Sequence, residues 1–313
     1  MPTRPMLTRP CRALDRFLRA LALAAASIGI ASLALGQLIR AEAKEAPPPN
    51  YQGLWWNAPA GSESGWGINL AHQRDVIFAT WFTYDTAGKA LWLSMTASIT
   101  EDGAYVGKLY QTQGPAFDSV PFTPELVTLT EVGAGTLVFD DDQNGRFLYT
   151  LNGVSQTKAI TRQVFGTLPT CVFGALSDLA LATNYQDIWY AAPAESEAGW
   201  GVNFTHQGDV IFATWFTYDA DRAPLWLSAT LGKAAAGVYT GTLVRTTGPA
   251  FSAVPFLPAD IGLTPVGTLT VAFANGNSAT FTYEVALGGP GNVVKQTKAI
   301  VRQLFIAPGT VCM

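Results

Sequence analysis

The chain has 313 residues, of which 49% are hydrophobic and only 13% are charged, so its composition lies outside the disordered class. A chain of this length can bury more than one hydrophobic core. The formal net charge of −4 and the scattered Lys and Arg residues provide no basic patch for a phosphate backbone, which argues against a nucleic-acid partner.

An export segment is predicted at the N-terminus, over residues 1–43. Five arginines precede a mostly apolar run from Ala20 to Ile39, which is the pattern of a signal peptide. Two small-x-small sites for signal peptidase follow, Ala34-Leu35-Gly36 and Ala41-Glu42-Ala43. The alternative is an uncleaved membrane anchor, because the run just reaches the length that spans a bilayer. A Pro-rich linker is predicted over residues 44–50, and the mature protein is expected in the periplasm, outside the cell or on its surface.

An internal duplication occupies the rest of the chain. A constant shift of 134 positions carries Tyr51 onto Tyr185 and every position through Phe117 onto Phe251. The stretch "DVIFATWFTYD" occurs twice unchanged, and "QTKAITRQVF" returns as "QTKAIVRQLF" after a net insertion of six residues. We therefore expect a first repeat at residues 51–171, a linker at 172–184 and a second repeat at 185–313, each of ordinary domain size.

Each repeat is predicted to be β throughout, because its apolar segments are short, rich in β-branched and aromatic residues, and separated by Gly, Asn, Asp or Pro. Tight turns join most segments, so neighbours should pair antiparallel, except across the long connection from Gln113 to Ala134. Sequential strands leave exposed edges unless the sheet closes, so two tandem eight-stranded up-and-down β-barrels are predicted, with β-sandwiches as the alternative. In the first repeat, the predicted strands are 51–57, 65–72, 75–84, 89–99, 104–112, 135–140, 145–152 and 155–165.

The repeated stretch from Asp75 to Asp85 is apolar on both faces of a strand. A barrel strand with one wet side should alternate between apolar and polar residues, so we expect one face to fill the barrel and the other to meet the sister barrel. Trp81 and its counterpart Trp215 are predicted core residues. The complete strand set of each repeat also leads us to expect that one repeat folds alone.

The strings "WWNAPAGSESGWG", "ATWFTYD" and "LWLS" resemble a group of secreted proteobacterial repeat proteins with the motifs W-W-x-P-x-E-S-G-W-G and T-W-F-x-Y-D. This resemblance covers nearly all of the chain after the export segment, and it implies secretion and a repeat architecture without a particular chemistry. A looser similarity is to avidin-like and lipocalin-like barrels, whose last strand carries an Arg that packs on the Trp of a first-strand G-x-W. It implies structural cation–π contacts between Trp55 and Arg162 and between Trp189 and Arg302, although Asp187 replaces the glycine in the second repeat.

The sequence contains no recognisable nucleophile with its base and no metal cluster. Ser64 lacks the G-x-S-x-G spacing and its counterpart is Ala198, which excludes a serine hydrolase. His72 and His206 are in separate repeats and cannot supply a three-ligand metal site, so they are interpreted as hydrogen-bonded turn residues. Neither a metal nor a cofactor is predicted.

Two glutamates recur at matching positions, Glu63 and Glu197. We interpret them as turn residues that cap backbone N–H groups. The alternative is an enzyme that acts on a glycan, in which Asp75 and Asp209 are the partners of these glutamates.

Aromatic side chains near the ends of strands are the best candidates for contacting a ligand. Core packing explains most of the nine tryptophans. The functional alternative is that Trp56, Trp66 and Trp200, with Glu63 and Glu197 beside them, contact a sugar ring or another flat apolar molecule. The predicted function is therefore a secreted, non-catalytic binding or surface-interaction protein in which each barrel provides a similar site. A purely structural or adhesive module is the alternative.

Cys171 and Cys312 each lie just beyond the last predicted strand of their repeat. Export permits a disulfide, and a bridge between these residues would tie the ends of the two repeats together. The alternatives are two free thiols or a bond between two chains.

Overall fold

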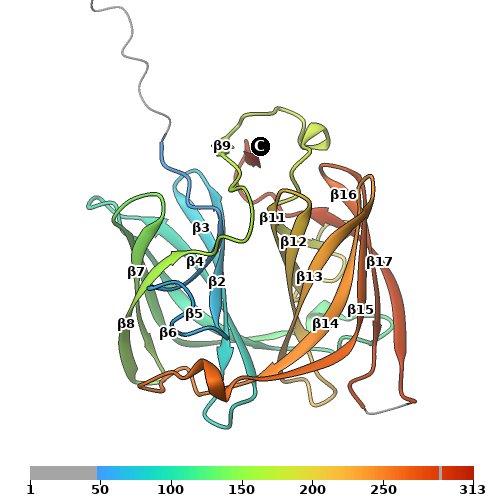
Figure 1. Cartoon of the computed structure of the whole chain (residues 1–313), viewed down its shortest axis with the longest axis horizontal. Helices are drawn as coiled ribbons and strands as arrows, with labels where there is room; N and C mark the ends of the chain where they lie inside the picture. The colour runs from blue at the N-terminus through green and yellow to red at the C-terminus, as the bar shows by residue number, and fades with distance from the viewer. Residues whose placement is uncertain (1–47, 289–290) are drawn as a thin grey trace, which may run out of the picture. The chain divides into compact units, whose positions relative to one another are not determined.

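The computed structural model describes residues 48–288 and 291–313, so the predicted export segment lies outside the described residues. Each repeat forms a closed barrel of eight antiparallel strands in sequence order. Figure 1 shows the first barrel in blue to green and the second in yellow to red. The predicted all-β fold with two tandem barrels is confirmed, and the β-sandwich alternative is wrong.

The strands of the two barrels correspond closely. The first barrel consists of β1 (Gly53–Asn57), β2 (Gly67–Gln73), β3 (Val76–Tyr84), β4 (Ala90–Ile99), β5 (Tyr105–Gln113), β6 (Thr128–Phe139), β7 (Asn144–Leu151) and β8 (Val154–Arg162). The second consists of β10 (Asp187–Ala191), β11 (Gly201–Gln207), β12 (Val210–Tyr218), β13 (Pro224–Ala235), β14 (Val238–Thr247), β15 (Gly262–Asn275), β16 (Ser278–Val285) and β17 (Val294–Arg302).

The remaining elements are short. They are the strands β9 (Cys171–Phe173) and β18 (Thr310–Cys312) and the 3-10 helices η1 (Pro124–Leu126), η2 (Leu179–Leu181) and η3 (Pro258–Asp260). In the described part of the chain, no helix has the length and apolarity needed to span a bilayer.

The largest difference from the predicted strands is the start of β6, at Thr128 instead of Gly135. Residues 128–131 are exposed, so no alternation of apolar and polar positions marks this half of the strand. Gly133 lies at an irregularity in the β5–β6 pairing, where an added Cβ would be 1.8 Å from the Thr150 carbonyl oxygen. Residues 128–134, which were predicted to belong to the long connection, therefore form the first half of a bulged strand.

Aromatic side chains fill the interior of each barrel. The ring centre of Trp81 lies 5.2 Å from that of Phe147 and 4.6 Å from that of Tyr149. In the second barrel, Trp215 lies 5.3 Å from Phe281. Trp81 is 3% exposed and Trp215 is 1% exposed, so both tryptophans are core residues.

An arginine on the last strand of each barrel packs on the tryptophan of the first strand. The guanidinium carbon of Arg162 lies 4.9 Å from the ring centre of Trp55, and that of Arg302 lies 5.1 Å from Trp189. In the second barrel, Asp187 adds an ion pair, with its Oδ2 3.2 Å from Nη1 of Arg302. The aspartate that replaces the first-strand glycine is therefore accommodated by pairing with the same arginine.

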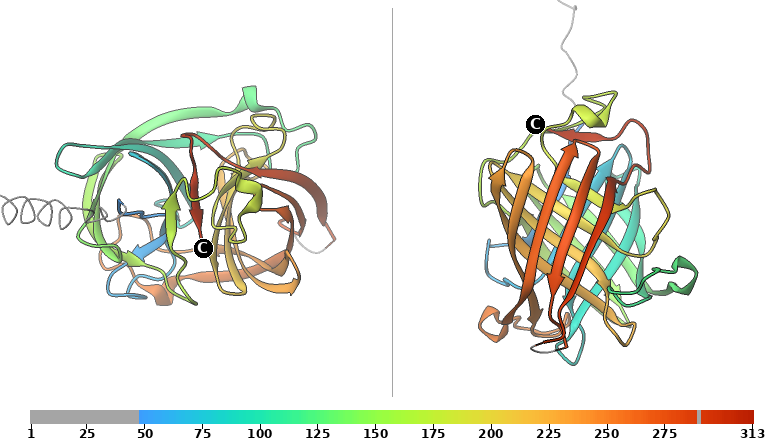
Figure 2. Two further views of the ribbon diagram at one scale, coloured as in Figure 1. Left: turned by 90° about the horizontal axis from the view of Figure 1, so that it is seen from above. Right: turned by 90° about the vertical axis from the view of Figure 1, so that its right-hand side faces the viewer.

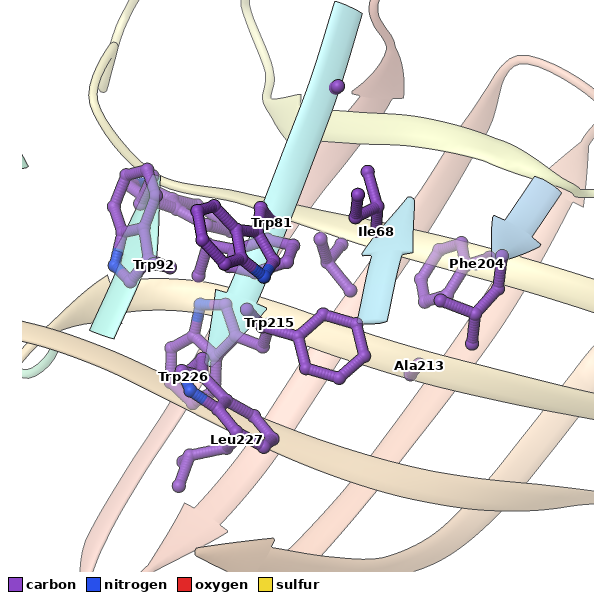
Figure 3. Packing of buried hydrophobic residues seen from close by; sticks show 14 of the residues in the cluster. Ile68, Trp81, Trp92, Phe204, Ala213, Trp215, Trp226 and Leu227 are labelled. Carbon is purple, nitrogen blue, oxygen red and sulfur yellow. The ribbon is translucent and has the colours of Figure 1, made fainter. Parts of the chain in front are cut away.

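Reciprocal hydrogen bonds join the outer faces of the two barrels. The indole N–H of Trp92 on β4 donates to the Thr217 carbonyl (2.9 Å), and that of Trp226 on β13 donates to the Thr83 carbonyl (2.9 Å). Both tryptophans belong to one cluster of buried residues that includes side chains of both repeats (Figure 3). The two repeats therefore pack as equivalent partners.

This packing explains why the stretch at β3 is apolar on both sides. Trp81 points into its own barrel, whereas the next residue, Phe82, lies with its ring centre 4.9 Å from that of Trp226 in the other barrel. The same strand therefore contributes to a barrel core and to the contact between barrels.

Each repeat also extends a loop into the barrel of the other repeat. We call residues 114–127 and 248–261, which connect the fifth and sixth strands of their repeats, the exchange loops. Phe117 of the first exchange loop donates its backbone N–H to the Tyr218 carbonyl (2.9 Å). Its own carbonyl accepts from the Tyr283 hydroxyl of the second barrel (2.8 Å).

The second exchange loop makes the equivalent contacts in the first barrel. Phe251 donates its N–H to the Tyr84 carbonyl (2.9 Å) and accepts from the Tyr149 hydroxyl (2.9 Å). Its ring lies 6.3 Å from Trp81, edge to face. Each barrel core is therefore completed by a phenylalanine from the other repeat.

The chain segments that follow the two barrels are joined by a disulfide. β9 and β18 pair as a two-stranded sheet, and Cys171 and Cys312 are bonded with a sulfur–sulfur distance of 2.04 Å. The Gln186 side-chain amide lies 3.4 and 3.5 Å from the two sulfur atoms. In the left view of Figure 2, this small sheet lies between the barrels. The predicted linker 172–184 therefore contains most of β9 and all of η2.

A buried histidine lies near one end of each barrel. Nδ1 of His72 accepts from the Tyr51 backbone N–H (3.0 Å), and its Nε2 lies 3.0 Å from the Tyr105 hydroxyl. His206 has the equivalent partners in the second repeat. Burial lowers the pKa of each histidine to about 4, because the charged imidazolium would lose its hydration. Both histidines are neutral near pH 7.

We expect acid to destabilise the fold between about pH 6.5 and pH 4. In this range the unfolded chain binds protons on both histidines and the folded chain does not. The free energy of unfolding therefore decreases as the pH is lowered. Asp187 opposes this, because burial raises its pKa to about 6 and the folded chain binds that proton first. Each group contributes roughly 3 kcal/mol, which leaves a net loss of about 3 kcal/mol.

Urea titrations at pH 7 and pH 4.5 measure this loss. The variant His72→Asn, whose Oδ1 can accept from the Tyr51 N–H, should remove the contribution of one histidine. An unchanged difference between the two pH values in this variant would show that His72 does not carry the effect.

Candidate functional site

Two clefts lie between the barrels, each with a volume of about 340 Å³. Cleft one is lined by Phe78, Thr80, Trp92, Ser94, Thr112, Pro124, Val127, Leu129, Ile188, Tyr190, Glu195, Ala198, Gly199, Trp200, Gly201, Phe216 and Gln303. Cleft two is lined by Trp56, Ser64, Gly65, Trp66, Phe82, Gln163, Phe212, Trp226, Ser228, Thr246, Pro258, Ile261 and Leu263. Most positions correspond through the duplication, so the clefts are equivalent, and their size falls at the lower end of the range for small-molecule sites.

Both repeats contribute to each cleft. In cleft one, the first repeat supplies outward-facing side chains of β3 and β4, including Phe78 and Trp92, and Val127 of its exchange loop. The second repeat supplies Tyr190 of β10 and Trp200, which directly precedes β11. A single repeat therefore cannot form either cleft. A ligand in either cleft would therefore contact both barrels, whereas the sequence led us to expect a similar site in each barrel.

A pair of partly exposed aromatic side chains lies in each cleft, one from each barrel. The pair is Phe78 and Tyr190 in cleft one, and Phe212 and Trp56 in cleft two. Because these rings are not fully covered, they can stack on a flat or apolar part of a bound molecule.

The tryptophans predicted to contact a ligand all line the clefts, but in two different ways. Trp56 is partly exposed in cleft two. Trp66 and Trp200 are only 4% and 6% exposed, so they form cleft walls and do not offer open stacking faces. Nothing in the sequence indicated that Tyr190, the partly exposed counterpart of Trp56, would line a cleft.

The two predicted glutamates hold the buried cleft tryptophans in place. Oε2 of Glu63 accepts from the Trp66 indole N–H (2.9 Å) and from Nζ of Lys158 (2.9 Å). Glu197 makes the same two contacts in the second repeat, at 2.8 and 2.6 Å. The prediction that these glutamates cap backbone N–H groups is therefore wrong, because their partners are side chains. Neither glutamate lines cleft one or cleft two.

The structure does not bring together the carboxylates of the enzyme alternative. Glu63 precedes β2 and Asp75 follows it, so the two side chains belong to opposite ends of one strand. Asp209 is paired with Lys233 instead (2.7 Å). Across residues 48–288 and 291–313, no group of three or more His, Cys, Asp or Glu side chains is placed to hold a metal ion.

Most polar groups in the clefts are uncharged. Among the described residues, the lining of cleft two includes no Asp, Glu, Lys, Arg or His, and that of cleft one includes one carboxylate, that of Glu195. The other polar side chains are hydroxyls and amides, namely Thr80, Ser94, Thr112 and Gln303 in cleft one and Ser64, Gln163, Ser228 and Thr246 in cleft two. Such a lining suits a small molecule with an apolar face and a few hydrogen-bonding groups.

Phe78 and Phe212 also line the clefts, although neither was a predicted site residue. The sequence did indicate that both lie on the outward apolar face of the repeated strand. What the sequence did not show is that the sister barrel covers only part of this face and leaves these rings open to a cleft.

In comparisons with known proteins, no family model, no curated protein and no solved structure matches the chain.

Proposed function

We propose that this chain is an exported, non-catalytic binding protein whose two clefts each hold a small molecule with an apolar face and a few hydrogen-bonding groups. The observation that carries this proposal is the pair of partly exposed aromatic rings in each cleft, one from each barrel, beside hydroxyl and amide groups. Aromatic surfaces with a few convergent polar groups are the common composition of ligand sites.

The duplication supports a stoichiometry of two ligands per chain. Both clefts have the same volume and corresponding walls, and both are built by the same parts of the two repeats. The separation of Glu63 from Asp75 and the side-chain partners of Glu63 support binding in preference to glycan hydrolysis.

A calorimetric and tryptophan-fluorescence screen of neutral oligosaccharides and small aromatic compounds tests the proposal. We expect a ligand that binds with a stoichiometry of two. Phe212→Ala should weaken cleft two about tenfold and leave cleft one intact, because it removes one face of the aromatic pair. Phe78→Ala should do the same for cleft one, and the double variant should lose measurable binding.

Leu148→Ala is the matched control, since Leu148 is exposed on β7 and lines neither cleft. It should bind like the unchanged protein. Full binding by the Phe78/Phe212 double variant would place the ligand elsewhere. A folded protein that binds nothing in the screen would favour the structural or adhesive alternative.

A further inference from the structure

The two clefts differ in charge at one pair of corresponding positions. Glu195 lines cleft one, whereas its counterpart in the first repeat is Gly61. Both residues adopt left-handed backbone conformations, with φ of 67° at Glu195 and 81° at Gly61. A glutamate is strained in this conformation and a glycine is not. The second repeat therefore has a charged side chain at a position where the backbone conformation favours glycine.

Glu195 lies beside the aromatic residue that its barrel contributes to cleft one. The pKa of Tyr190 is raised from 10.0, first because burial disfavours the phenolate and second because the Glu195 carboxylate is close. The same proximity is built into the first repeat, where a Cβ added to Gly61 would lie 3.9 Å from Cη2 of Trp56. The side chain at this position therefore stands next to the partly exposed ring of the cleft.

The carboxylate of Glu195 is exposed, and none of the ion pairs or side-chain hydrogen bonds among the described residues involves it. Glu197, two residues later, is instead committed to Lys298 and Trp200. Arg222 contacts the exchange loop of the first repeat, which lines part of cleft one, by donating to the Leu126 carbonyl. Arg222 itself does not line cleft one. Glu195 is therefore available to a ligand.

We propose that cleft one binds an organic cation, whose apolar face packs between Phe78 and Tyr190 while its positive charge lies near Glu195, and that cleft two binds only uncharged molecules. An aromatic ring beside a carboxylate is a favourable combination for an ammonium group, because the ring face and the carboxylate both attract positive charge. This inference rests on the proposed function, and it names the ligand class that separates the two clefts.

Choline and 3,3-dimethylbutan-1-ol test the inference, because they have the same shape and differ in charge. In calorimetric titrations of the full chain, we expect choline to occupy one site per chain, about five- to tenfold more tightly than the neutral alcohol. Glu195→Gln should remove this preference and leave the affinity for the alcohol within about twofold. The preference should also weaken as salt is added, since the carboxylate is exposed.

Gly61→Glu is the reciprocal variant. The corresponding turn of the second repeat accommodates a glutamate with φ of 67°, so the first repeat should accommodate one as well. We expect this variant to bind two choline molecules per chain. Far-ultraviolet circular dichroism establishes that each variant is folded before its titration is interpreted.

The outcomes separate this inference from the proposed function. Equal affinity for choline and the alcohol in the unchanged protein, or a choline preference that survives in Glu195→Gln, would overturn the charge assignment while the clefts remain binding sites. If neither probe binds and no compound of the broader screen binds, the proposed function fails and the assignment fails with it.

Discussion

The isolated first repeat, residues 51–171, is expected to unfold at a much lower urea concentration than the full chain and to self-associate as its concentration rises. Without the second repeat, its barrel loses Phe251, which contacts Trp81 and Tyr149. Phe82 and Trp92, which are 6% and 5% exposed in the full chain, become open to water. The loss of one buried phenylalanine costs about 3–5 kcal/mol, so the total should exceed 3 kcal/mol.

Self-association is expected because the two repeats are equivalent partners. A second copy of the first repeat can offer Phe117 in place of Phe251 and reproduce the reciprocal contacts between barrels. Sedimentation over a range of concentrations and urea titration of the same samples measure both effects. Cys171→Ser prevents a disulfide between the isolated repeats.

Phe251→Ala in the full chain is the matched control. It should reproduce part of the stability loss without changing the oligomeric state of the full chain, because the covalent connection between the repeats is kept. A monomeric isolated repeat as stable as the full chain would show that the exchange loops contribute little and that one repeat folds alone.

Trp81→Ala is expected to lower the free energy of unfolding by about 3–5 kcal/mol, the usual cost of removing a large buried aromatic side chain. Trp81 is 3% exposed, and its indole N–H has no hydrogen-bond partner among residues 48–288 and 291–313. Removing the ring therefore leaves no acceptor unpaired, and the cost comes from lost packing against residues such as Phe147 and Tyr149. Urea titration of the full chain measures it.

Trp81→Phe separates packing from any role in binding. It keeps an aromatic ring in the same space and should cost less, about 1–2 kcal/mol. If Trp81→Ala left the unfolding midpoint unchanged and abolished the ligand response of the screen, Trp81 would belong to a binding site and not to the core.

The barrels could be predicted from the sequence because their signals are local. Turn residues and the alternation of buried and exposed positions on strands such as Asn144–Leu151 are set by neighbours along the chain. The start of β6 could not, since residues 128–131 are exposed on both faces and only pairing with β5 makes them a strand. The position of Phe117 in the other barrel could not be predicted either, because a loop has no periodicity that indicates which barrel it enters.

The candidate site was predicted only in part, because it depends on how one repeat packs against the other. Trp56, Trp66 and Trp200 were found from their residue type and their position near strand ends. Tyr190 and Phe78 reach the same cleft from different repeats, and no pattern within one repeat specifies that meeting. The clefts therefore follow from the packing of the outer barrel faces, and the sequence indicated only that those faces are apolar.

The exchange loops also constrain how the gene can change. A substitution at Phe117 changes the core packing of the second barrel, and a substitution at Phe251 changes that of the first. The stretch Val76–Tyr84 must in turn suit its own barrel and the other repeat at once, and so must Val210–Tyr218. Two repeats that complete each other's cores cannot diverge independently. A duplicated segment that packs against two partners therefore keeps the same residues while the surrounding sequence changes.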